Sequence, residues 1–332
     1  MKNLFTILLL VVTTTLFAIN PNDTRMLSQP ATSATQIAFI YAEDLWVANA
    51  DGSNPKRLTV DEGVESAPVF SPDGKWIAFS AQYDGNTDVF IIPVEGGIPV
   101  RLTWHPGVDN VRGFSPDGKS VLFTSQRAVF TNRYAQLFTV PITGGFPAQL
   151  EIPNAFHASY SPDGKFMAYT PIADAFRQWK HYRGGTIAFI WLFSFADKSV
   201  VKIPQPEGGC NDAGPQWLGG KVYFRSDRNG EFNLYAYDVA SKEVKQLTDF
   251  KDFPVLNMAA GDGKVILEQA GYLHNFDVAA ATTKKLTVGI AADLQELRAR
   301  FVKGGTYIRT ADISPSGSRA LFDFRGDRKS VV

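Results

Sequence analysis

A ten-residue segment occurs three times, in slightly different form, between residues 70 and 169. It reads FSPDGKWIAF at 70–79, FSPDGKSVLF at 114–123 and YSPDGKFMAY at 160–169. An internal period of this length is typical of repeat folds, in which each repeat is one supersecondary unit that buries its faces against its neighbours. This repeat constrains the fold of the chain more than any other feature of the sequence.

The second repeat, residues 64–103, shows the pattern of one unit most clearly. A type I turn is predicted by four consecutive residues, Ser71, Pro72, Asp73 and Gly74, whose types suit its four positions. Gly74 can also adopt the left-handed conformation of the bulge that follows such a turn in a hairpin. We expect one four-stranded antiparallel meander per unit, with strands in this unit at 67–71, 76–82, 88–94 and 98–103.

The same pattern occurs six times between residues 27 and 288. Its fourth strand closes with the string RLT in the first two units and with QLT or KLT in the fifth and sixth. A single four-stranded sheet cannot bury both of its faces, and sheets of this size and period stack radially around a channel. We therefore predict an all-β fold, a six-bladed β-propeller of four-stranded antiparallel blades over 27–288. Each unit carries its own four strands, so we expect the ring to close without strand exchange, by side-chain packing between the terminal blades.

The composition excludes several classes of function. Of the 332 residues, Lys plus Arg number 33 and Asp plus Glu also number 33, so there is no basic excess to bind nucleic acid. The only cysteine is Cys210, which rules out an intrachain disulfide. We expect this side chain to be half buried in a turn and not to act as a nucleophile.

The N-terminus is predicted to direct export. Residues 1–20 combine Lys2 with an apolar run at 4–18 that is short for a membrane span, and this is the pattern of a secretory signal peptide. The alternative is an uncleaved membrane anchor. No later apolar run approaches the roughly 20 residues that a membrane helix needs, so we expect no membrane span after removal of the signal and a periplasmic location.

The C-terminal residues do not continue the sixth unit. We expect a linker with one helical turn at 289–307, and then the first hairpin of a second propeller at 308–332, built around another Ser-Pro-Ser-Gly turn. The segment ends before the third and fourth strands that a blade requires. We therefore expect an incomplete blade, with the chain interrupted inside a second domain.

Two further segments carry a resemblance to a known family. The string QWKHYRGGTIAFIW at 178–191 resembles the Trp-Lys-x-Tyr-Arg-Gly-Gly-Thr…Ile-Trp motif of the tricorn protease family, and ADISPSGSRALFDFRGD at 311–327 resembles the first hairpin of that family's second propeller. Residues 27–327 as a whole resemble the N-terminal TolB-like propeller region of bacterial tricorn-type serine peptidases.

The resemblance implies a six-bladed propeller, a seven-bladed propeller, a helical and PDZ region, and a serine protease core, in that order. It places the catalytic residues beyond this chain, which would then be non-catalytic and would channel peptides to or from the absent core. Implied partners are peptides, the remaining domains of the protease and other copies of the chain in an oligomer. Two alternatives remain: a TolB-like periplasmic binding propeller that acts without a protease core, and a propeller that is an enzyme by itself.

Motifs for catalysis, cofactors and metals are missing from the sequence: there is no G-x-S-x-G, H-E-x-x-H, C-x-x-C or phosphate-binding glycine loop. We therefore predict no catalytic residues, no cofactor and no metal. His105 and His157 both precede the first strand of a blade, so they are candidates to line the channel, and a metal held by such histidines is the enzyme alternative.

The candidate peptide-binding residues are His105, Arg112 and Arg183. The family holds a peptide's terminal carboxylate with a basic pair near the start of the third blade, where this chain reads WHPGVDNVRG at 104–113. Only His105 is close to that pair, with Arg112 further on, so the chain departs from the family pattern. Arg183 in the fourth-blade insertion can offer a bidentate fork to a carboxylate; alternatively, it braces the insertion while Trp179 and Tyr182 pack beneath it.

Overall fold

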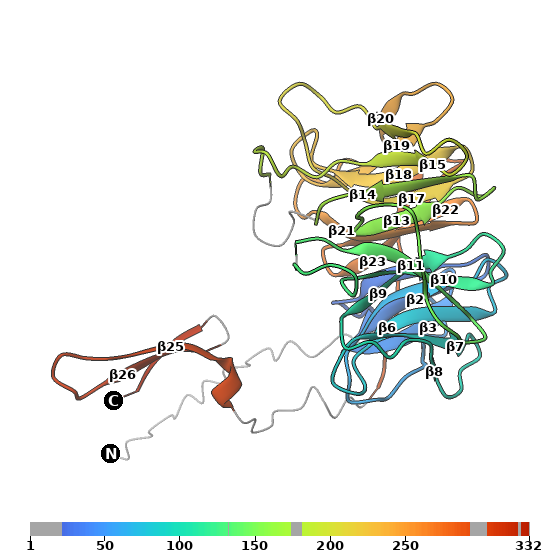
Figure 1. The fold of residues 1–332 in the computed structure, drawn as a ribbon. Helices are drawn as coiled ribbons and strands as arrows, with labels where there is room; N and C mark the ends of the chain where they lie inside the picture. The colour runs from blue at the N-terminus through green and yellow to red at the C-terminus, as the bar shows by residue number, and fades with distance from the viewer. Residues whose placement is uncertain (1–21, 132, 174–180, 293–303, 325–326, 332) are drawn as a thin grey trace, which may run out of the picture. The chain divides into compact units, whose positions relative to one another are not determined.

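The computed structural model describes residues 22–131, 133–173, 181–292, 304–324 and 327–331. The predicted signal peptide at 1–20 and Trp179 of the insertion lie outside these residues. The described secondary structure is almost entirely β-strand (Figure 1). The chain divides into two compact units, Met1–Ala291 and Ala292–Val332, which are described separately below.

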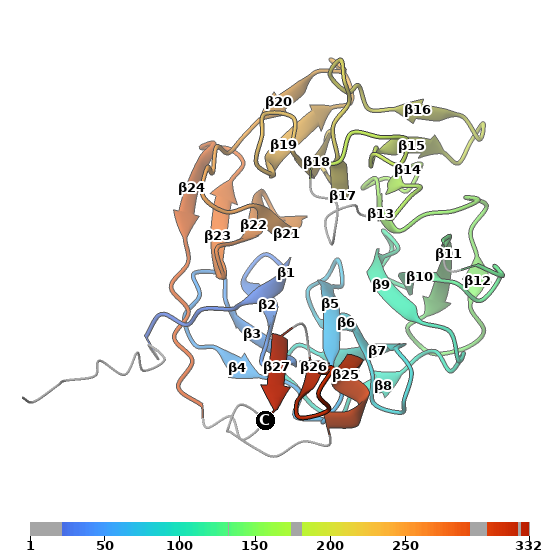
Figure 2. The same cartoon turned by 90° about the vertical axis from the view of Figure 1, so that its left-hand side faces the viewer.

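The first unit contains six four-stranded antiparallel sheets, and in each sheet the four strands follow one another in chain order. The sheets are arranged as blades around a central axis (Figure 2), so the predicted all-β, six-bladed propeller is confirmed. The six blades consist of β1 Ser28–Thr32, β2 Gln36–Tyr41, β3 Asp44–Asn49 and β4 Lys56–Arg57; β5 Glu65–Phe70, β6 Trp76–Ala81, β7 Asp88–Pro93 and β8 Val100–Arg101; β9 Asp109–Phe114, β10 Ser120–Ser125, β11 Gln136–Pro141 and β12 Ala148–Gln149; β13 His157–Tyr160, β14 Phe166–Thr170, β15 Trp191–Ser194 and β16 Val200–Lys202; β17 Asp212–Leu218, β18 Lys221–Ser226, β19 Asn233–Asp238 and β20 Val244–Gln246; β21 Val255–Gly261, β22 Lys264–Gln269, β23 Tyr272–Asp277 and β24 Thr282–Lys285.

The Ser-Pro-Asp-Gly turn has the geometry that its residues predict. The N–H of Gly74 donates to the carbonyl of Ser71 at 2.9 Å, and Gly74 has φ +70°. The Ser71 hydroxyl donates to Asp73 Oδ1 at 2.7 Å and accepts the N–H of Trp76 at 3.0 Å. These local bonds satisfy the polar groups of the turn within six residues, so each copy of the motif can close its hairpin independently.

The outer strands are shorter than the sequence predicts. The fourth strand of the second blade was expected at 98–103, whereas β8 covers only Val100–Arg101. This strand lies at the edge of its sheet and pairs on one side only. The RLT string explains how so short a strand is held: Thr103 Oγ1 accepts the N–H of Val89 at 3.0 Å, and Arg101 forms an ion pair with the buried Asp88 at 2.6 Å.

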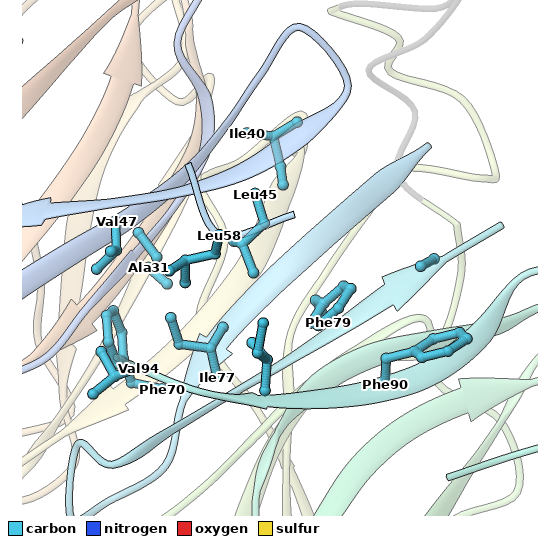
Figure 3. Packing of buried hydrophobic residues seen from close by; sticks show 13 residues of the cluster. Ala31, Ile40, Leu45, Val47, Leu58, Phe70, Ile77, Phe79, Phe90 and Val94 are labelled. Atoms are coloured by element: carbon cyan, nitrogen blue, oxygen red, sulfur yellow. The ribbon is translucent and has the colours of Figure 1, made fainter. Parts of the chain in front are cut away.

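Hydrophobic side chains fill the wedges between blades. In the wedge between the first and second blades, Ile40, Leu45 and Val47 pack with Ile77, Phe79 and Phe90 (Figure 3). Phe79 and its equivalents Phe39, Phe123 and Phe224 are fully buried. Burial of such a side chain stabilises the fold by roughly 1.5–3 kcal/mol, and this packing accounts for the aromatic-rich second and third strands.

The ring closes without strand exchange, as expected, but it does not close by side-chain packing alone. The N–H of Thr24 donates to the carbonyl of Val288 at 2.8 Å, and the N–H of Leu27 donates to the carbonyl of Gly271 at 3.2 Å. The Thr24 hydroxyl also accepts the N–H of Ile290 at 2.9 Å. The segment before β1 therefore binds the last blade through main-chain hydrogen bonds, which the repeat itself does not reveal.

The second unit contains the 3₁₀ turn η3 Gly304–Tyr307 and three antiparallel strands, β25 Ile308–Ile313, β26 Ala320–Phe324 and β27 Asp327–Val331. The Ser-Pro-Ser-Gly turn repeats the geometry of the first unit, with Gly317 at φ +70°. From the sequence, this segment was expected to end before its third strand. The structure differs, because residues 327–331 pair with β26 along its length and form that strand.

Candidate functional site

The first strand of every blade lines the central bore. Each of these six strands contacts the first strand of the next blade, and β21 of the last blade contacts β1 of the first; Figure 2 shows them around the axis. A cavity of about 680 Å³ occupies the end of the bore at which the first hairpins turn. All six blades contribute to its wall, through Thr32, Val69, Arg112, Ser159, Gln216 and Gly261 among others.

Hydrogen bonds between neighbouring blades hold this wall together. The side-chain Oε1 of Gln29 accepts the N–H of Ala67 at 2.7 Å, and the backbone N–H of Gln29 donates to Glu268 Oε2 at 2.8 Å, so one residue joins three blades. Elsewhere the Ser80 hydroxyl accepts the N–H of Val111 at 2.8 Å, and the Ser159 hydroxyl accepts that of Trp217 at 2.9 Å. These bonds fix the positions of the first strands, and thus of the side chains that face the bore.

Bulges in the first strands direct particular residues towards the axis. In β9, Val111 pairs with Phe123 and Gly113 pairs with Leu122, so Arg112 between them has no partner in the ladder. A bulge bends a strand and re-aims the side chain of its extra residue. The sequence shows an arginine at this position, but it does not show that Arg112 is left out of the main-chain pairing between β9 and β10.

Arg112 is the one predicted peptide-binding residue that lies on the wall of the cavity. Its Nε donates to the Thr124 hydroxyl at 3.2 Å. Burial lowers the pKa of its guanidinium to about 10, so the group still carries its positive charge at neutral pH. The side chain places a cation inside the bore.

His157 at the start of β13 is affected by the charges of two arginines, Arg112 and Arg225. Burial, together with the positive charges of Arg112 and Arg225, lowers the pKa of His157 well below its usual value, so the imidazole is neutral at pH 7. Arg225 is 3% exposed and donates to the carbonyl of Leu256. The bare Cα of Gly214 faces its guanidinium, and a Cβ there would meet Arg225 Nε at 3.4 Å.

Arg225 is a residue that the sequence analysis missed. Arg225 is the fifth residue of the second strand of its blade. In the six blades this position is occupied by Ile40, Ser80, Thr124, Thr170, Arg225 and Glu268. A charged residue occurs there only in the last two blades. This contrast between otherwise equivalent positions is the signal that could have found it.

The structure does not bring His105 and Arg183 into the same set of contacts as Arg112. His105 Nδ1 accepts the N–H of Gly107 at 2.9 Å, and the His105 carbonyl accepts from Asn86 at 2.8 Å. Within the described parts of the chain, no three His, Cys, Asp or Glu side chains are grouped so that they could hold a metal ion.

Arg183 instead binds the buried carboxylate of Asp227. Arg183 NH1 lies 2.7 Å from Asp227 Oδ2, and His181 Nδ1 lies 3.3 Å from the same oxygen. Asn211 donates its backbone N–H to Asp227 Oδ1 at 2.7 Å. Asp227 was also missed, because only the fold brings the end of β18 next to the fourth-blade insertion. These contacts agree with the bracing alternative for Arg183.

Cys210 is fully buried, and not half buried as expected. Burial and the neighbouring Asp212 raise the pKa of its thiol to about 12, so the reactive thiolate is scarce at neutral pH. Across the described residues there is no helix with the length and hydrophobicity needed to cross a membrane.

Comparison with known proteins agrees with this architecture. The family described as the tricorn protease N-terminal β-propeller domain matches residues 24–282. The tricorn protease homologue of Saccharolobus solfataricus is 25% identical over 84% of this chain and 26% of its own length, and tricorn protease homologue 1 of Streptomyces coelicolor is 29% identical over 78% and 24%. This chain thus spans about a quarter of the length of these relatives.

Solved structures show the same fold. The crystal structure of the tricorn protease superposes with a TM-score of 0.73 at 22% identity, covering 92% of this chain and 30% of that one. TolB from Acinetobacter baumannii gives a TM-score of 0.59 at 20% identity, covering 77% and 65%. With the family match over most of the propeller, the chain belongs to the tricorn protease N-terminal β-propeller domain family.

Proposed function

We propose that this propeller is a non-catalytic part of a tricorn-type serine peptidase and that its bore admits peptides on their way to or from a protease core. The observation that carries the proposal is the cavity of about 680 Å³ on the axis, whose wall is built by all six blades. Its wall mixes apolar side chains with hydroxyls and an amide, such as Val69, Ser159 and Gln216, which suits the alternating apolar and polar groups of an extended peptide.

The catalytic residues would belong to domains that this chain does not contain, because the chain spans only about a quarter of its curated relatives. The partners of the propeller would be those domains, peptides, and further copies of the protein. Of the three candidate peptide contacts, we assign the bore contact to Arg112. His105 lies in the loop before β9, and Arg183 positions the insertion through Asp227.

We further propose that residues 1–20 direct the chain across the inner membrane to the periplasm. The alternative function is a TolB-like periplasmic binding propeller that acts without a protease core. TolB proteins match shorter stretches of this chain: the TolB homologue of Chlorobium luteolum is 36% identical over 59 residues. The tricorn relatives match most of the propeller, and this difference favours the peptidase assignment.

Blocking the bore tests the proposed function. Gly113 lines the cavity, and a Cβ added there would meet nothing within 4 Å. Gly113→Trp should therefore fill the bore without disturbing the blades. We expect fluorescently labelled unstructured peptides to bind the wild-type chain, as measured by anisotropy, and to bind the variant at least tenfold more weakly.

The matched control is Gly305→Trp, which adds the same side chain at an exposed position of the second unit where a Cβ is equally unobstructed. This variant should bind peptides as the wild type does. Equal peptide affinity of Gly113→Trp and the wild type, with both proteins folded, would rule out passage or binding of peptides in the bore.

A further inference from the structure

A second cavity lies in the wedge between the third and fourth blades, which are neighbours in the ring (Figure 2). Its volume is about 510 Å³, which is within the range of sites that bind small molecules. One wall is the face of the fourth blade that is turned towards the third, and the other wall is the segment that follows β12. No described residue lines both this cavity and the one in the bore, so the two are separate sites.

Aromatic side chains form most of the fourth-blade wall. Tyr169 lies opposite Trp191 in the sheet, and Phe193 lies opposite Val200, so the pleat of the sheet places these four lining residues on one face. The rings of Tyr169 and Trp191 meet edge to face, with their centroids 5.9 Å apart. A wall of this kind packs favourably against a flat aromatic ring.

Two opposite charges lie at the mouth of the cavity. Glu151 stands where the RLT string has its threonine, because the outer strands of the second and third blades pair in the same register. Thr103 turns inward and bonds to the third strand, whereas the Glu151 side chain is 68% exposed and forms an ion pair with Lys198 of the fourth blade. Exposed ion pairs are weak, so a ligand that carries both charges can replace this one.

Tyr169 adds a polar group that has no partner in the described parts of the chain. The residue is only 2% exposed, and its hydroxyl forms no hydrogen bond with any described residue. Burial raises the pKa of Tyr169 to about 12, so the hydroxyl keeps its proton at neutral pH. A buried hydroxyl without a partner is costly unless a bound molecule supplies one.

We propose that this cavity binds a free aromatic α-amino acid in its zwitterionic form. The ring of the ligand lies against the aromatic wall, its ammonium group binds Glu151, and its carboxylate binds Lys198. The Tyr169 hydroxyl supplies a further hydrogen bond inside the cavity. Adjoining opposite charges next to an aromatic wall match this class of molecule, since an α-amino acid carries both charges beside its side chain. The site requires no peptide in the bore, so it is independent of the proposed function.

Isothermal titration calorimetry with L-phenylalanine tests the site. The wild-type chain should bind it, and Glu151→Gln should bind it about 3- to 10-fold more weakly, because one charge-assisted hydrogen bond is lost. The matched control is Glu243→Gln, which removes one negative charge from an exposed position of the fifth blade and should bind as the wild type does. The absence of saturable binding to the wild type, or equal affinities of Glu151→Gln and the wild type, would overturn the proposal.

Analogues that lack one charge test the two ends of the ion pair separately. The wild type should prefer L-phenylalanine to 3-phenylpropanoate, which has no ammonium group, and to phenethylamine, which has no carboxylate. Glu151→Gln should lose the first preference, and Lys198→Gln should lose the second. Preferences that persist unchanged in both variants would contradict a zwitterion held by this pair. L-alanine that binds as tightly as L-phenylalanine would refute the role of the aromatic wall.

Trp191 reports on the location of the ligand. Addition of L-phenylalanine should change the tryptophan fluorescence of the wild type, and Trp191→Phe should lose this change. Tyr169→Phe should bind L-phenylalanine more weakly, yet it should resist urea at least as well as the wild type, because the hydroxyl that it removes bonds to no described residue. A fluorescence change that survives in Trp191→Phe would place the ligand elsewhere and refute this inference.

Discussion

Glu65, at the start of β5, is a carboxylic acid that is completely buried in the propeller. Its Oε1 accepts the hydroxyl of Tyr83 at 2.5 Å. Burial, with a smaller contribution from the negative charge of Asp44, raises the pKa of Glu65 to about 8. The folded protein therefore keeps this group protonated at pH values at which the unfolded chain has released the proton.

This difference predicts how stability depends on pH. Between the unfolded pKa of about 4.5 and the folded pKa of about 8, the native state binds one proton more than the unfolded state. The free energy of unfolding should therefore fall as pH rises through this window, by at most about 1.4 kcal/mol per pH unit from this group. Glu65→Gln should remove this pH-dependent component. The free energy of unfolding of the variant should therefore rise relative to that of the wild type as the pH increases to 8.

Urea denaturation at pH 5, 6, 7 and 8 would measure the effect, because the difference between variant and wild type isolates one group from all others. Glu62→Gln, at an exposed position three residues earlier, serves as the control and should follow the wild-type pH profile. A Glu65→Gln profile parallel to that of the wild type would show that Glu65 ionises normally in the folded state.

At the scale of the element, the residues of the RLT string and its QLT equivalent attach a very short outer strand to the third strand of its blade. Thr59, Thr103 and Thr248 each accept the N–H of a residue in the third strand, at 2.9 to 3.0 Å. Thr103 also donates to Asp88 Oδ1 at 3.2 Å, and Arg101 pairs with the same carboxylate. These side-chain bonds join the third and fourth strands where main-chain pairing is limited to two or three residues.

Thr103→Val keeps the shape of this side chain but removes its hydroxyl. It leaves the N–H of Val89 without an acceptor in a buried site, so we expect the free energy of unfolding to fall by roughly 1–3 kcal/mol. The sixth blade supplies a control within the same motif, since Thr287 is exposed and Thr287→Val should change stability little. Similar denaturation midpoints for both variants would mean that the hydroxyl of Thr103 is not needed to hold β8.

At the scale of the whole molecule, a propeller without strand exchange must hold its first and last blades together by other means. Here the segment before β1 crosses to the last blade, where Thr24 binds both Val288 and Ile290, and Lys285 forms an ion pair with Asp23 at 2.6 Å. Thr24 is 1% exposed, so water cannot replace these partners.

Thr24→Val should loosen this closure. The N–H of Ile290 loses its acceptor, and we expect a loss of roughly 1–3 kcal/mol in the free energy of unfolding. Hydrogen exchange should rise mainly in the first and sixth blades, while Thr283→Val, at an exposed position of β24, should leave it unchanged. Exchange that rises equally in all six blades would argue against a local role of this segment in closing the ring.

The sequence by itself determined the number of blades, the order of the four strands in each blade and a ring that closes without strand exchange. Each blade depends on contacts between residues close along the chain: the turn at Ser71–Gly74 satisfies itself within six residues, and the alternation of buried positions is local. Such interactions recur wherever the string recurs, so a period in the sequence predicts a period in the structure.

Only the tertiary structure decided what faces the bore and how the ring closes. Arg112 points to the axis because of a bulge, Arg225 packs against the bare Cα of Gly214, and Asp227 holds Arg183 of a distant insertion. Thr24 and Ile290 meet across 266 residues of sequence. These pairings join residues that no repeat relates to one another, and they exist only once the six blades have assembled around a common axis.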